Sequence, residues 1–286
     1  MGFLGKLFDT DSARKEFVRK RDAEIRGVDY RPITAEVLAT WFSASTLPDN
    51  QLKDTLSRHS FSEHVPTHEE ICKTLFGVEN VFKEYKAVSH PPAMSYPAHI
   101  GDKTLDKLVE MFGDVPRVGV ECGSFIGSSA AVLGSLMKKN GGVLICVDTW
   151  CGDINMWLRD EFSSTMVKKD GNPRIYERFM NNCIENGLTH TVVPFRVSST
   201  VGVRTLKVLN YTIDFVYVDS AHEAGETFME LSLFWNLLRP GGILLGDDYW
   251  GFPALKHDVD LFCKVHHCKP VFSGDSDTWL IKKPLS

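Results

Sequence analysis

The chain has 286 residues, of which 43% are hydrophobic and 24% charged, and its formal net charge is -5. That balance is typical of a folded globular protein and excludes a disordered or membrane-embedded class. The acidic excess argues against a general affinity for nucleic acid, because phosphate binding requires clustered Lys and Arg. The length allows one large α/β domain with an appended helical segment.

The cysteines and the apolar runs indicate the cellular compartment. Seven cysteines form no CxxC pair and several lie in apolar runs, so we expect reduced, buried thiols. Cys263 and Cys268 flank two histidines in CKVHHC, but this spacing matches no common zinc motif. No run approaches the ~20 apolar residues of a membrane span, and the start lacks the apolar core of a secretory signal. We therefore expect a cytoplasmic protein with neither a membrane nor a nucleic-acid partner.

The first third of the chain, residues 1–95, has apolar residues at helical spacing and little that indicates a strand. Thr67 followed by Glu70 matches a capping box, which predicts the start of a helix there. The proline-rich HPPAMSYPAHIG then interrupts any helix, so we place a domain boundary between residues 1–95 and 96–286. The helical segment is expected to shape the acceptor site as a cap, or to form a contact between copies of the chain.

From residue 102 onward, short apolar runs alternate with helical patterns, which is typical of βαβ units and a parallel sheet. Each run is continuously apolar, as expected of strands covered on both faces. KPVFSG and DTWLIKK predict a final antiparallel hairpin, so the expected sheet has seven strands and is mostly parallel. The five parallel runs are RVGVEC (117–122), GVLICVD (142–148), TVVPFRV (191–197), DFVYVD (214–219) and GILLGDD (242–248).

Carboxylates follow four of these five runs. Glu121 ends the first run, Asp148 the second and Asp219 the fourth, while Asp247 and Asp248 end the fifth. The carboxyl ends of parallel strands meet at one edge of a sheet, where ligands bind. Mutual repulsion disfavours such a cluster unless cations or hydroxyl-rich ligands lie among the carboxylates.

The first strand–helix connection, ECGSFIGSS, is rich in glycine. Gly123 and Gly127 let the backbone approach a ligand and direct helix N-terminal amides at a negative group. Asp148 lies 27 residues after Glu121, where a carboxylate can accept both ribose hydroxyls of a nucleoside. NAD-dependent oxidoreductases share this arrangement, so these two motifs predict nucleoside binding without choosing a reaction.

Three longer stretches are similar to one enzyme family. VECGSFIGSSA resembles the first motif of class I S-adenosylmethionine methyltransferases, and VDTWCGD resembles the second. VDSAHEAGETFMELSLFWNLLRPGGILLGDDYW resembles the later motifs of the metal-dependent catechol, macrocin and cephalosporin-pathway O-methyltransferases. The resemblance covers roughly residues 100–286 and implies a Rossmann-like α/β fold.

The resemblance also implies a set of cofactor contacts. The first-turn glycines border the methionine part of S-adenosylmethionine, Ser129 holds its carboxylate, and Asp148 takes the ribose. A serine after the third strand, Ser198 or Ser199, faces the adenine. The whole implied set is Glu121, Gly123, Phe125, Gly127, Ser129, Asp148, Thr149, Ser198, Ser199 and Asp219.

Asp219, Asp247 and Asp248 offer hard oxygen ligands suited to Mg2+, and in the resembling enzymes this trio binds the metal. The alternative is that Asp247 and Asp248 only cap the following loop. His222 lies three residues after Asp219, and the macrocin-type enzymes use a histidine there as general base. A histidine with an ordinary pKa of ~6.5 suits that task. A solvent-facing or helix-capping histidine is the other interpretation.

The expected function is therefore the Mg2+-assisted transfer of a methyl group from S-adenosylmethionine to a small hydroxylated molecule. An NAD-dependent oxidoreductase is the alternative enzyme, although it leaves the three aspartates unexplained. A scaffold that binds the cofactor without turnover is the alternative outside catalysis, since a fold does not determine an activity.

Overall fold

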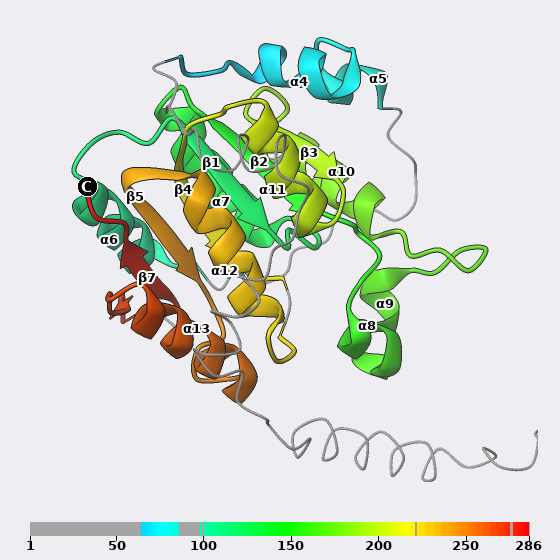
Figure 1. Cartoon of the computed structure of the whole chain (residues 1–286). Helices are drawn as coiled ribbons and strands as arrows, with labels where there is room; N and C mark the ends of the chain where they lie inside the picture. Colours follow the sequence, from blue (N-terminus) through cyan, green and yellow to red (C-terminus); the bar gives the residue numbers. More distant parts are fainter. Residues whose placement is uncertain (1–63, 86–97, 99, 221, 275–276, 286) are drawn as a thin grey trace, which may run out of the picture.

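The computed structural model describes residues 64–85, 98, 100–220, 222–274 and 277–285 (Figure 1). The helical patterns predicted before residue 64 and most of the proline-rich boundary lie outside the described residues. None of the described helices is long and apolar enough to cross a membrane.

A seven-stranded sheet forms the centre of the fold, in the order β3-β2-β1-β4-β5-β7-β6. The first five strands are parallel to their neighbours, whereas β7 is antiparallel to both β5 and β6. The predicted mostly parallel α/β sheet with a terminal antiparallel hairpin is therefore confirmed. The strands are β1 (Val118–Cys122), β2 (Val143–Asp148), β3 (Val192–Arg196), β4 (Ile213–Val218), β5 (Leu238–Gly246), β6 (Val271–Phe272) and β7 (Trp279–Lys282).

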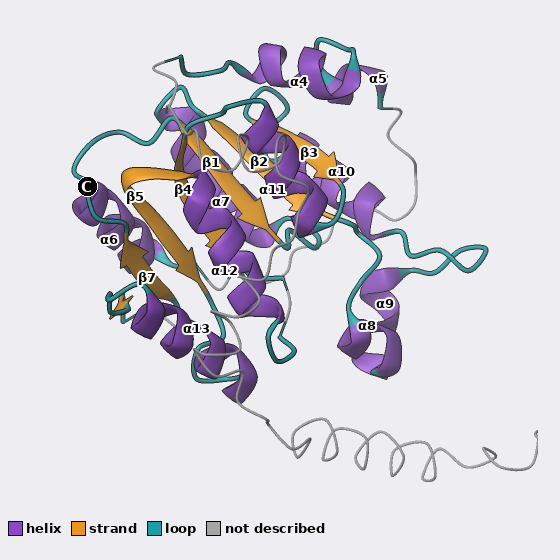
Figure 2. Ribbon diagram, in the orientation of Figure 1, coloured by secondary structure: helices purple, strands orange, loops and turns teal. Residues whose placement is uncertain are grey.

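Both faces of the sheet are buried, which explains why the strands are continuously apolar (Figure 2). In β2, Val143, Ile145 and Val147 enter one core, while Leu144 and Cys146 enter the other. This alternation follows from the two-residue period of a strand. The longer helices that contribute to the second core are α6 (Asp102–Phe112), α7 (Ser128–Lys139) and α10 (Ile175–Glu185). Those that contribute to the first core are α11 (Ser199–Val208), α12 (Glu226–Leu237) and α13 (Pro253–Val265).

The two ends of the sheet carry different additions. Residues between β2 and α10 form α8 (Ile154–Leu158), a single 3-10 turn η1 (Asp160–Phe162) and α9 (Ser163–Met166). Figure 1 shows α8 and α9 at the end toward which the parallel strands point, where ligands bind in such sheets. The sequence patterns did not predict these helices, because elements this short show no periodicity.

At the opposite end, α4 (His68–Phe76) and α5 (Val81–Glu84) lie beside the start of β3. The capping box predicted from Thr67 and Glu70 is confirmed. A ring nitrogen of His68 lies 3.0 Å from the carbonyl oxygen of Val192, and the side-chain amide of Asn80 donates to the carbonyl of Thr189. These contacts hold the short helical segment against the sheet.

Asp214 in β4 should contribute strongly to stability. Its carboxylate is buried and accepts the backbone N–H groups of Arg117 and Val118 and the Nε–H of Arg239. We expect Asp214→Ala to lower the free energy of unfolding by roughly 3 kcal/mol, because it leaves buried amides and a cation without their acceptor. Urea unfolding measures this, with Asp106→Ala on the exposed face of α6 as the control. Equal unfolding midpoints for the two variants would contradict the prediction.

Candidate active site

The turn from β1 into α7 brings two strand ends close together. Gly123 has a φ of +85°, and a Cβ there would overlap the carbonyl oxygen of Asp219. Gly127 has a φ of +89° and precedes the first turn of α7. Glycine is required at Gly123 because this backbone conformation and this close approach both exclude a side chain.

A cavity of about 320 Å³ opens beside this turn. Of the ten residues expected to contact the cofactor, it is lined by Gly123, Phe125, Asp148, Thr149, Ser198, Ser199 and Asp219. Residues from the ends of β1, β2 and β4 and from the N-terminus of α11 therefore line one cavity. Ser129 lines the adjoining cavity, whereas Glu121 and Gly127 line neither.

Asp148 has both a structural and a possible ligand-binding role. Its Oδ2 accepts the N–H of Phe125 at 2.8 Å, and its Oδ1 accepts the N–H of Trp150 at 2.6 Å. Burial raises the pKa of Asp148, while these amides lower it in part. A carboxylate has about four lone-pair positions, so two bonds leave capacity for ribose hydroxyls.

Glu121 lies behind the turn and is completely buried. Burial raises the pKa of its carboxyl group above the ordinary value. The thiol of Cys146 donates to Oε2, whereas Oε1 has no hydrogen-bond partner in the described part of the chain. Glu121 therefore supports the cavity wall from the side away from the ligand.

The second cavity, of about 240 Å³, shares six lining residues with the first, so the two adjoin. Its wall contains Asp219, His222 and Asp248, together with Phe252 from the loop before α13 and Arg159 from the segment after α8. The shared residues are Gly123, Phe125, Asp153, Met156, Asp219 and Ser220.

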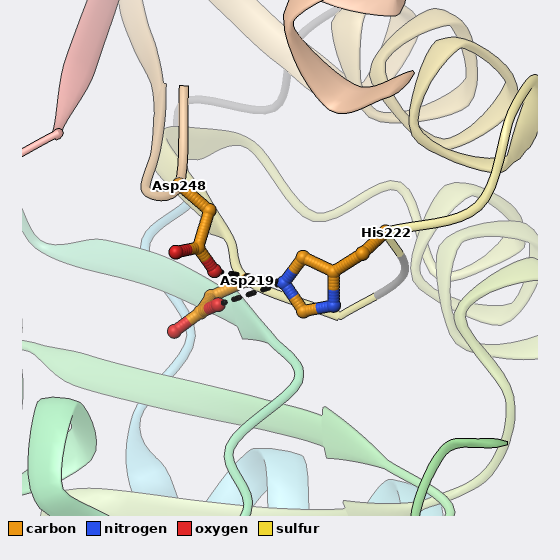
Figure 3. A group of neighbouring side chains, drawn as sticks. All are labelled: Asp219, His222 and Asp248. Carbon is orange, nitrogen blue, oxygen red and sulfur yellow. Dashed lines mark hydrogen bonds and ion pairs between the residues drawn. The ribbon is translucent and has the colours of Figure 1, made fainter. Parts of the chain in front are cut away.

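Three side chains in this second cavity point at one another (Figure 3). The Nε2 atom of His222 lies 2.9 Å from Oδ2 of Asp248 and 3.8 Å from Oδ1 of Asp219. One ligand atom from each of the three residues lies within 4.8 Å of the other two, close enough to hold a metal ion together. Among the described residues this is the only such group, so Cys263, Cys268 and their histidines form none.

The charges around His222 determine its protonation. Burial alone would lower its pKa, but the neighbouring carboxylates of Asp153, Asp248 and Asp219 raise that pKa to about 10. Both ring nitrogens of His222 therefore carry a proton at neutral pH when no ligand is bound, so the ring is positively charged. It balances part of the negative charge of the carboxylates.

Asp247 lies apart from this group. Its side chain is almost fully buried and accepts a hydrogen bond from the Thr278 hydroxyl at 3.4 Å. Asp248 has a φ of +62°, so the chain turns sharply between the two aspartates and their side chains diverge. The structure thus brings Asp219 and Asp248 together with His222, and leaves Asp247 at β7.

Sequence reasoning missed several residues of the two cavities. Asp153 lines both cavities, and Glu230 reaches the first cavity from the middle of α12, where it accepts a hydrogen bond from Ser220. The ring of Phe252 stacks on that of His222 with centroids 4.3 Å apart. Of these residues, only Asp153 had a usable signal in the sequence, because it ends the VDTWCGD motif and an aspartate just before a short helix is a common N-cap. That pattern could have identified Asp153.

Comparison with known proteins identifies the domain type. Residues 120–249 match the family model described as a methyltransferase domain. That range includes the first cofactor motif as well as Asp219, His222 and Asp248. No curated protein sequence matches the chain.

Several solved structures are similar at low sequence identity. The O-methyltransferase from Bacillus cereus, solved in complex with SAH, is 14% identical with a TM-score of 0.44; the match covers 65% of this chain and 83% of that one. The O-methyltransferase TomG from Streptomyces achromogenes, involved in tomaymycin synthesis and solved with SAM, is 15% identical with a TM-score of 0.45. That match covers 87% of this chain and 96% of TomG.

Proposed function

We propose that this chain, of which residues 120–249 match a methyltransferase domain, is a class I S-adenosylmethionine-dependent enzyme that methylates a hydroxyl oxygen of a small molecule, with His222 as general base. The observation that supports this most is the position of His222 and two carboxylates in a cavity adjoining the one lined by Asp148. An acceptor in that cavity lies next to the cofactor and beside a proton-accepting group.

The proposed cofactor position follows from the first cavity. Asp148 accepts the ribose hydroxyls, Ser198 or Ser199 faces the adenine, and the methionine part extends past Gly123 toward Ser129. This direction leads the sulfonium toward the residues that the two cavities share. The acceptor then approaches from the side of His222, which brings the reacting atoms together and accounts for much of the rate acceleration.

The proposed reaction is a single displacement. The O–H bond of the acceptor breaks and its proton passes to Nε2 of His222. The oxygen forms the new O–CH3 bond, and the S–CH3 bond breaks with its electron pair remaining on sulfur. The products are a methyl ether and S-adenosylhomocysteine, and the proton later leaves His222 for solvent.

We further propose that Asp219 and Asp248 hold a divalent cation such as Mg2+, with Asp247 outside its ligands. Two carboxylates converging on one partly buried position provide suitable donors, and a protonated His222 now supplies the positive charge there. A bound cation would lower the pKa of a nearby hydroxyl and would offset the carboxylate charge that keeps His222 protonated. His222 can act as a base only after that offset.

Removal of the cation is therefore expected to reduce turnover strongly. Methyl transfer from labelled S-adenosylmethionine would be measured with catechol, a monophenol and a sugar as acceptors, and the methylated atom identified by mass spectrometry. We expect EDTA to reduce turnover roughly 10²-fold or more. Asp248→Asn should have the same effect while S-adenosylhomocysteine still raises the melting temperature.

Two outcomes would contradict the proposal. Full turnover in EDTA would exclude the cation, and a product methylated on nitrogen or carbon would exclude the hydroxyl acceptor. NAD serves as the ligand control in the melting experiment, because an oxidoreductase would be stabilised by NAD.

A further inference from the structure

Asp153 lies between the two cavities, and the proposed reaction gives this residue no role. It lines both cavities and belongs to the short connection between β2 and α8. Its Oδ1 accepts the backbone N–H of Met156 at 2.7 Å and thereby caps the start of α8. Its second oxygen, Oδ2, makes no contribution to that cap and faces His222.

The ring of His222 presents its two nitrogens to different partners. Nε2 points at Asp248 and Asp219, while Nδ1 is turned to the other side of the ring (Figure 3). Nδ1 is buried and has no hydrogen-bond partner among the residues that the structure describes, and Oδ2 of Asp153 lies 3.9 Å from it. Stacking on Phe252 restrains the plane of the ring, and a half-turn within that plane would replace Nε2 by a carbon atom beside Asp248.

A buried N–H without an acceptor costs free energy of about 1–3 kcal/mol. A movement of roughly 1 Å would bring Oδ2 and Nδ1 within hydrogen-bond distance. Catalytic hydrogen bonds are often long without ligands and shorten when the site fills. Asp153 forms part of the wall of both cavities. A molecule bound in either cavity would therefore lie beside the contact between Asp153 and His222.

We propose that Asp153 is a positioning residue that accepts the Nδ1–H of His222 and so directs the lone pair of Nε2 toward the acceptor hydroxyl. The inference rests on the proposed role of His222 as base. In a neutral imidazole only one of the two nitrogens carries a proton. A carboxylate beside one nitrogen keeps the proton there and leaves the lone pair on the other nitrogen. Burial alone would raise the pKa of Asp153, but His222 and the Met156 amide lower it, so Asp153 remains an ionised acceptor.

Asp153→Asn separates this role from the capping role. The amide oxygen of asparagine can still accept the Met156 N–H, so α8 keeps its cap. The NH2 group then replaces Oδ2 beside Nδ1 and donates to it, which forces the ring proton onto Nε2. Asp153→Glu keeps a carboxylate that can reach Nδ1, and Asp160→Asn is the matched control, because Asp160 is exposed in the same segment and lines neither cavity.

The first measurement is independent of the acceptor. Ring N–H signals would be recorded by proton–nitrogen NMR with S-adenosylhomocysteine bound, and His222 assigned by the signal lost in His222→Gln. We expect a downfield, slowly exchanging Nδ1–H signal in the wild type and in Asp160→Asn, and its loss in Asp153→Asn. An unchanged Nδ1–H signal in Asp153→Asn would overturn the proposal.

The second measurement is kinetic and uses an acceptor that shows turnover in the methyl-transfer assay. Asp153→Asn should lower kcat roughly 10²-fold, as loss of an orienting partner does, with unchanged KM for the acceptor and unchanged affinity for S-adenosylhomocysteine. Asp153→Glu should recover much of that loss. Normal kcat in Asp153→Asn alongside an inactive His222→Gln would refute only this inference, whereas normal kcat in His222→Gln would refute the proposed function itself.

Discussion

Replacement of His222 by glutamine is expected to lower kcat by roughly 10²- to 10⁴-fold, which is the usual contribution of a general base. Glutamine keeps a polar side chain beside Asp248 but cannot take a proton from the acceptor. The affinity for S-adenosylhomocysteine should stay unchanged, because His222 is not among the residues proposed to contact the cofactor. Single-turnover methyl transfer and calorimetric binding measure the two quantities.

His267→Gln is the matched control, since His267 is exposed and lines neither cavity. It should keep full activity. If His222→Gln retained the wild-type rate and pH profile, the base would have to be another group.

The His222→Gln substitution should also change stability in a pH-dependent way. The pKa of His222 is raised from 6.5 to about 10, so its charge stabilises the metal-free fold fully below pH 6.5, and this stabilisation is lost as the pH rises through 10. The difference in melting temperature between wild type and His222→Gln should therefore be largest near pH 6 and should shrink steadily from pH 6.5 to pH 10. A constant difference would contradict the raised pKa.

Gly123→Ala is expected to abolish cofactor binding and to destabilise the fold by several kcal/mol. The new Cβ would overlap the carbonyl group of Asp219 and the Cα of Ser220, and both are backbone atoms that cannot rotate away. The turns after β1 and β4 would have to separate, which would displace the walls of both cavities. Thermal unfolding with and without S-adenosylhomocysteine measures stability and binding together.

Gly113 provides the control for backbone strain alone. It also has a positive φ, of +74°, but a Cβ there would meet no atom within 4 Å. Gly113→Ala should therefore lower stability by about 1 kcal/mol, the cost of the strained conformation, and leave binding intact. Equal effects of the two variants would show that steric overlap at Gly123 is unimportant.

The sheet and the edge that carries the candidate site follow from the pattern of amino acids alone. Continuous apolar runs predict strands buried on both faces, and each run ends within a few residues of its predicted end. The residues directly after parallel strands must gather at one edge, so Asp148 and Asp219 could be assigned to the site from their positions alone. His222 followed from its spacing to Asp219.

Which neighbouring carboxylates face the same cavity depends on the three-dimensional fold. Asp247 and Asp248 are equivalent in the sequence, yet a positive φ at Asp248 directs one side chain to His222 and leaves the other beside Thr278. Asp153 comes from a connection too short to show a pattern, and its place beside His222 depends on how α8 packs. Strand periodicity is a local property, whereas the direction of a loop side chain depends on backbone angles and contacts between segments far apart in the sequence.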